Sequence, residues 1–144
     1  GPPREVYDQP ANEFVARFIG AMNVFESEVR GGVARAGELE FPAPGRPDGD
    51  RLRLGFRPYA VQISADPAAY RYPAILRHAF FLGVVMRLEL EMPSGLAVRA
   101  RITKEEYTQL GLAEDAPVSF QIRQFRVFSR DDAAPAAEDQ WGRI

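Results

Sequence analysis

The sequence predicts a mostly β domain, and three observations carry that prediction. Apolar and polar residues alternate over several stretches of strand length, turn-forming Gly, Pro and Asp separate these stretches, and the clearest helix signal comes late, after residue 103. Many short strands with one capped helix near the end are typical of a small OB-like barrel or sandwich. We therefore expect such a fold, with a short helical segment before the first strand and one short helix before the last strand.

The bulk composition excludes several function classes. The 144 residues suit one compact domain, and 46% hydrophobic residues are enough for a core. A net charge of −2 argues against a general binder of nucleic acid or membrane surfaces, because both need clustered positive charge. The chain has no cysteine, which excludes disulfides and thiolate metal sites. No apolar stretch approaches the ~20 residues that cross a bilayer.

A helix is predicted near the N-terminus. Asn12 suits the N-cap of a helix that ends at Gly20. Phe14 and Phe18 lie four residues apart and therefore share one helix face. Because so short a helix is not stable alone, we expect it to dock on another part of the protein.

From Asn23 onward the hydrophobic period changes to two. Residues 24–30 and 33–36 are predicted to form a hairpin around the tight turn Gly31-Gly32. The further predictions from this region are a loop over residues 41–50, strands over 51–56 and 60–64, and a connection over 66–72.

The strongest strand signal covers residues 84–92 and 96–102, joined by the turn residues Pro93-Ser94-Gly95. The large apolar residues have even numbers in both stretches, so both apolar faces fall on the same side of a hairpin. A three-residue loop then places Glu89 opposite Arg99, a pair of opposite charges worth roughly 0.2–1 kcal/mol.

The end of the chain is predicted as helix, strand and tail. Thr103 and Glu106 form a capping box for a helix that Gly111 ends. A last strand covers residues 118–128, where a change of parity near Arg123 predicts a β-bulge. Residues 130–144 are rich in Asp, Ala and Pro, and we expect a disordered tail.

Residues that could carry catalysis lack the partners that catalysis needs. The sequence contains no G-x-x-x-x-G-K-[ST], G-x-G-x-x-G, H-E-x-x-H or G-x-S-x-G motif. We interpret His78, the only histidine, as structural or exposed. Glu89 and Glu91 share a strand face as a catalytic pair would, but Arg99 and Arg101 balance them, which favours a solvated face.

Several phenylalanines leave a nucleic-acid alternative open. Aromatic rings on an OB surface can stack on bases, although a basic groove should accompany them. Core packing is the usual role of phenylalanine, and we expect it here. The residues concerned are Phe80, Phe81, Phe120, Phe125 and Phe128.

Two patterns resemble a known family. Residues 3–20 and Asn23 carry the pattern P-x-x-V-Y-x-x-P-A-N-x-F-V-A-x-F-I-G-x-x-N, which resembles the segment that closes the nucleotide-binding domain of ABC importer ATPases. Gly55, Arg57 and Pro58 form a G-x-R-P turn similar to the one in the transport-associated OB domain of the same proteins. The stretch 88–128 looks most like the ATPases that import sulfate and thiosulfate.

The resemblance implies a division of the chain into three parts. Residues 1–22 would be the helical end of the nucleotide-binding domain, residues 23–129 an OB-like accessory domain, and residues 130–144 a tail. ATP and Mg²⁺ would bind to the upstream domain, so we expect no catalysis and no cofactor in this chain. The implied partners are that upstream domain, the membrane permease subunits and a second copy of the chain. The implied location is the cytoplasm, at the inner face of a bacterial membrane.

Two classes of function follow as expectations. The first is a regulatory domain that stabilises the dimer of an importer ATPase, as the resemblance implies. The second is a module that binds a small oxyanion through Arg57, Arg99 and Arg101, because guanidinium groups bind such anions through paired hydrogen bonds. Binding of single-stranded nucleic acid is a third and weaker alternative, and no nucleic-acid partner is expected.

Overall fold

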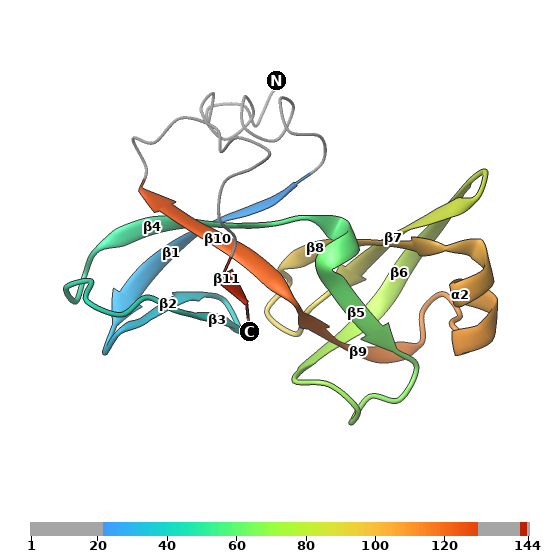
Figure 1. Cartoon of the computed structure of the whole chain (residues 1–144). Coiled ribbons are helices and arrows are strands. Elements are labelled where there is room, and N and C mark those ends of the chain that lie inside the picture. Colours follow the sequence, from blue (N-terminus) through green and yellow to red (C-terminus); the bar gives the residue numbers. More distant parts are fainter. Residues whose placement is uncertain (1–21, 130–141, 144) are drawn as a thin grey trace, which may run out of the picture.

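A computed structural model describes residues 22–129 and 142–143 as two antiparallel sheets (Figure 1). The first sheet has the strand order β11-β10-β4-β1-β2-β3, and the second has the order β5-β9-β6-β7-β8. The first sheet comprises β1 (Asn23–Arg30), β2 (Val33–Ala36), β3 (Leu39–Pro42), β4 (Arg51–Phe56), β10 (Gln124–Ser129) and β11 (Gly142–Arg143). The second comprises β5 (Val61–Ser64), β6 (Tyr72–Leu82), β7 (Val85–Glu91), β8 (Ala97–Thr103) and β9 (Pro117–Ile122). The mostly β, OB-like fold is thereby confirmed.

The helix predicted for residues 12–20 and most of the predicted tail lie outside the described residues. Within the tail, Gly142 and Arg143 form the short strand β11, which pairs with Gln124 and Phe125 of β10. No helix among the described residues is long and apolar enough to cross a membrane.

The first hairpin is confirmed. Arg30 of β1 pairs with Val33 of β2, so Gly31 and Gly32 form a two-residue turn. Their φ angles are +58° and +75°, and a type I′ turn needs positive φ at both central residues. Glycine adopts these angles without strain, which explains the pair of glycines.

Besides β11, two further strands, β3 and β6, are additions to the predicted set. Leu39 and Phe41 are fully buried in β3, where we had expected a loop from residue 41. The strand has only four residues, too few for alternation to distinguish it from the loop that follows. β6 shifts its register against β7 between Leu76 and His78, which interrupts the alternating pattern and hides the longest strand of the fold.

The even-numbered residues of β7 and β8 face the core, as predicted. Leu88, Val98 and Ala100 are fully buried, and Glu89 lies opposite Arg99 in the register of the two strands. Val84 is the exception, because it belongs to the turn before β7 and is 80% exposed. Alternation alone cannot show where a hairpin ends.

The bulge predicted near Arg123 is wrong. The stretch 118–128 is two strands in two sheets: β9 pairs with β5 and β6, and β10 pairs with β4. The amide of Arg123 donates a hydrogen bond to the carbonyl of Ala60 (2.9 Å) at the point of transfer. Ile122 is buried in the second sheet and Phe125 in the first, so the change of parity marks a change of sheet.

The helix before the last strands is confirmed as α2 (Lys104–Leu110). The hydroxyl of Thr103 accepts a hydrogen bond from the amide of Glu106 (3.0 Å), and the Glu106 carboxylate accepts one from the amide of Thr103 (2.8 Å). Gly111 ends the helix with φ +69°.

One hydrophobic core continues through both sheets. The ring of Phe41 packs on Phe56 and Phe125, with centroids 6.0 and 4.9 Å away, on the side of the first sheet. Tyr72 and Phe120 pack 5.4 Å apart in the second sheet. The core therefore uses Phe120 and Phe125 for packing, whereas Phe80 and Phe81 are exposed.

Candidate functional site at the seam between the sheets

The G-x-R-P turn carries the chain from the first sheet to the second (Figure 1). Gly55 is buried near the end of β4, and the 3₁₀ turn η2 (Pro58–Ala60) leads directly into β5. Arg57 has an extended backbone, and its carbonyl accepts a hydrogen bond from the amide of Ala60 (2.9 Å). Pro58 suits the first position of the turn because its fixed φ fits and its missing N–H is not needed there. The turn thus has a clear structural role.

Asn23 also links the two sheets at their boundary, which we call the seam. Its side-chain Nδ2 donates hydrogen bonds to the carbonyls of Arg99 (2.9 Å) and Phe56 (3.4 Å), and its Oδ1 accepts one from the amide of Arg99 (2.8 Å). Asn23 is 7% exposed. One buried amide therefore ties β8 of the second sheet to β1 and β4 of the first.

The structure brings together only part of the predicted oxyanion set. Arg99 and Arg101 are exposed on the same face of β8. The guanidinium carbon of Arg101 lies 5.9 Å from the ring centroid of Tyr59, in the turn that Arg57 precedes. The backbone of Arg99 is bound to Asn23, and its side chain does not line the pocket described next.

A pocket of about 270 Å³ opens between the edge strands β5 and β8, with α2 at one side. Its charged lining residues are Arg101, Arg123 and Glu106. Arg123 is held in place by a hydrogen bond from its Nη2 to the carbonyl of Tyr59 (2.9 Å). The other lining residues are Tyr59, Val61, Gln62, Ile63, Tyr70, Ile102 and Leu110.

This seam pocket has the chemistry of a weak anion site. Two guanidinium groups can donate paired hydrogen bonds, and the Glu106 carboxylate is already engaged in the capping box. None of the lining groups forms a nucleophile and base pair. Sequence reasoning missed Arg123, although its place at the parity change was a signal that the chain turns there.

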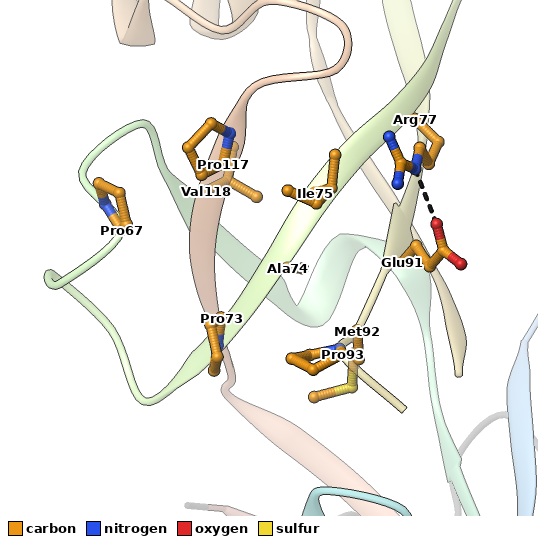
Figure 2. Close-up of a pocket in the computed structure, with 10 residues that line it drawn as sticks. All are labelled: Pro67, Pro73, Ala74, Ile75, Arg77, Glu91, Met92, Pro93, Pro117 and Val118. Atoms are coloured by element: carbon orange, nitrogen blue, oxygen red, sulfur yellow. Dashed lines mark hydrogen bonds and ion pairs between the residues drawn. The ribbon is translucent and has the colours of Figure 1, made fainter. Parts of the chain in front are cut away.

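A second pocket, of about 400 Å³, is mostly apolar (Figure 2). Four proline rings line it, with Ile75 and Met92 among the other apolar residues; the prolines are Pro67, Pro73, Pro93 and Pro117. At its rim Arg77 forms ion pairs with Glu91 (2.7 Å) and Asp115 (3.3 Å). The hydrogen bond to Glu91, and to a smaller extent the one to Asp115, raises the pKa of Arg77. The charged groups at this pocket thus satisfy each other.

The remaining candidates do not assemble a reactive centre. Glu91 is paired with Arg77, and Glu89 lies beside His78 in the register of β6 and β7. His78 is exposed, with its ring centroid 5.9 Å from that of Phe80. Among the described residues, no group of three His, Asp or Glu side chains could hold a metal ion.

The sequence matches no family model, but it is similar to curated proteins. It is 35% identical over 133 residues to the sulfate/thiosulfate import ATP-binding protein CysA of Bordetella pertussis. This alignment covers 90% of this chain and 38% of that protein. It is 34% identical over 137 residues to CysA of Nitrosomonas europaea, covering 89% of this chain and 37% of the relative. The molybdate/tungstate import ATP-binding protein WtpC of Pyrococcus abyssi is 30% identical to this chain over 134 residues. That alignment covers 89% of this chain and 38% of WtpC.

A solved structure with the same fold is that of the cytoplasmic molybdate-binding protein ModG with molybdate bound. The TM-score is 0.60 at 18% sequence identity, over 74% of this chain and 95% of that chain. At such low identity the likeness shows the fold alone, and it confirms an OB-like domain.

The described residues thus form an OB-like domain. The predicted resemblance to the ATP-binding subunits of ABC importers, and to those for sulfate and thiosulfate in particular, is confirmed. The chain spans less than two fifths of the length of these curated relatives.

Proposed function

We propose that this chain is the C-terminal regulatory and dimer-stabilising part of an ABC importer ATPase, with residues 23–129 as the accessory domain. The observation that carries the proposal is the extent of the match: about nine tenths of this chain aligns with little more than a third of an import ATP-binding protein. A compact OB-like domain that lacks a reactive centre in its described residues fits an accessory role.

Catalysis would then belong to another part of the importer subunit. This sequence has no phosphate-binding loop, so ATP and Mg²⁺ would bind to the nucleotide-binding domain that the relatives carry. The substrate of the intact importer would be sulfate or thiosulfate, as in the relatives' names. The partners would be the nucleotide-binding domain and the permease subunits at the cytoplasmic face of the membrane.

Sedimentation equilibrium tests the dimer-stabilising role. Importer ATPases work in pairs in this proposal, and closed pairs use a self-complementary surface. We expect the chain to dimerise with a micromolar dissociation constant, about −8 kcal/mol, because an accessory domain supplies only part of the contact. If the chain sediments as a monomer at every concentration from about 1 µM to about 1 mM, the dimer-stabilising role is contradicted. A micromolar dissociation constant would give mostly dimer at the upper end of this range.

A second candidate function is oxyanion binding in the seam pocket. The observation that favours it is the meeting of Arg101 and Arg123 at one pocket next to the turn of Arg57. Isothermal titration with sulfate and with molybdate, at constant ionic strength, tests it. Arg101→Gln and Arg123→Gln should abolish binding, whereas Arg99→Gln, outside the pocket, should leave it unchanged. Equal heats for sulfate and chloride would exclude the function.

A further inference from the structure

The end of the β6–β7 hairpin exposes a cluster of large apolar side chains. Phe80, Phe81, Leu82 and Val84 are 38, 59, 53 and 80% exposed. They make up four of the six large hydrophobic residues that are exposed among the described residues. Figure 1 shows the hairpin projecting from the body of the second sheet. We call residues 80–84 the hairpin end.

The core does not explain these residues. Met86, further along β7, is 6% exposed and belongs to the core, but the hairpin end extends past that core. Two partly exposed phenylalanines with a leucine and a valine present on the order of 400 Å² of apolar surface. Patches of this size on soluble proteins are often contact surfaces.

Basic groups lie directly on the rings of the hairpin end. The guanidinium carbon of Arg87 is 4.8 Å from the ring centroid of Phe80, and the ammonium nitrogen of Lys104 is 5.1 Å from that of Phe81. Such contacts bind the cation to the face of the ring. The apolar surface is therefore flanked by positive charge.

Acidic groups lie at the same end of the domain. The Glu114 carboxylate accepts a hydrogen bond from the amide of Ala79 (2.9 Å), one residue before the hairpin end. Glu105 and Glu106 follow Lys104 in the first turn of α2. Groups of both charges thus lie next to the hairpin end or in the helix turn that begins beside it. A surface of this kind complements a second copy of itself, whereas an anionic bilayer would be repelled by the carboxylates.

We infer that the hairpin end is the surface through which two copies of this chain associate. In a two-fold pair, the apolar centres would meet, and the basic groups of one copy would approach the acidic groups of the other. Two patches of on the order of 400 Å² each, with their charged rims, reach the roughly 1,000 Å² that a specific interface needs. The inference rests on the proposed dimer-stabilising role and gives it a location.

Sedimentation of surface variants tests the inference. The double variant Phe81→Ser with Leu82→Ser should raise the dimer dissociation constant at least ~10-fold, the equivalent of about 1.4 kcal/mol. The control is Leu110→Ser. Leu110 is an exposed apolar residue on α2, outside the hairpin end, so its replacement should change the dimer dissociation constant by no more than a factor of about 2. Unchanged thermal unfolding at low concentration would show that the variants fold.

Hydrogen exchange at low and high protein concentration gives an independent measurement. The amides of residues 80–84 should be protected at high concentration in the wild type and not in the double variant. A dimer that the double variant leaves intact overturns the inference alone and preserves the proposed role. If the wild type stays monomeric at every concentration, both the inference and the proposed dimer-stabilising role are overturned. The same holds if the monomeric wild type binds anionic vesicles.

Discussion

The side-chain amide of Asn23 and the backbone of Arg99 form a reciprocal pair of hydrogen bonds, at 2.9 and 2.8 Å. The two residues are 76 positions apart in the sequence. The side-chain amide offers one N–H donor and one carbonyl acceptor, as the backbone of a neighbouring strand would. It thereby satisfies the backbone N–H and C=O of Arg99 at the free edge of β8. It also holds the second sheet against the first, at Phe56, the last residue of β4. Asn23, the last residue of the pattern that first indicated the family, therefore has a specific structural role.

Replacing Asn23 should weaken the whole fold. Asn23→Ala removes all three side-chain hydrogen bonds and should lower the free energy of unfolding by about 2–3 kcal/mol. The matched control is Ser27→Ala, which removes one buried hydrogen bond, from the Ser27 hydroxyl to the carbonyl of Leu52, and should cost about 1 kcal/mol. Urea unfolding measures both. Equal losses for the two variants would show that the seam does not depend on Asn23.

Leu88 should be a principal contributor to stability. Its side chain is fully buried in the middle of β7, so Leu88→Ala leaves a cavity and should cost about 2–5 kcal/mol. Leu110→Ala is the control, because Leu110 is 38% exposed, and its loss should be much smaller. The urea midpoint at constant m-value is the measurement. A negligible shift for Leu88→Ala would contradict the burial of the even-numbered face.

Glu40 should contribute to stability in a pH-dependent manner. The hydrogen bond and charge of Arg35, with a smaller part from Arg71, lower the pKa of the Glu40 carboxyl below its ordinary value of 4.5. A carboxyl whose pKa is lower in the folded state stabilises the fold above its unfolded pKa. That contribution is lost as the pH falls through the lower, folded-state value.

Urea midpoints at pH values from neutral down to below 4.5 will reveal this contribution. The wild type should lose more stability on acidification than Glu40→Gln, which has no titrating group at this position. Parallel pH profiles for wild type and Glu40→Gln would refute the role of Glu40.

The chain alone should not hydrolyse ATP. Its sequence lacks the glycine-rich loop and lysine that bind the phosphates in P-loop ATPases. Phosphate release in the presence of ATP and Mg²⁺ should equal that of a buffer blank. Activity that co-purifies with the chain, and that persists through a second chromatographic step, would contradict the assignment of catalysis to the upstream domain.

Local patterns were sufficient for part of the structure. Alternation over residues 84–92 and 96–102 predicted the pairing of Glu89 with Arg99 and, except at Val84, the buried face, because side chains on a strand alternate strictly between its two faces. The Gly31-Gly32 turn and the Thr103–Glu106 capping box were also predictable. Each depends on residues within four positions of one another, so backbone sterics and short-range hydrogen bonds determine it.

The sequence by itself thus determined the mostly β class, the β1–β2 and β7–β8 hairpins and the capped helix. Two patterns, one long and one short, also indicated the family resemblance. Only the tertiary structure decided that residues 117–129 serve two sheets, that Asn23 binds Arg99, and that Arg123 joins Arg101 at one pocket. It also decided that Phe81 is exposed while Phe120 is buried, although both lie in strands of the second sheet. These features depend on contacts between residues far apart in the chain, and local periodicity carries no information about which distant strands will meet.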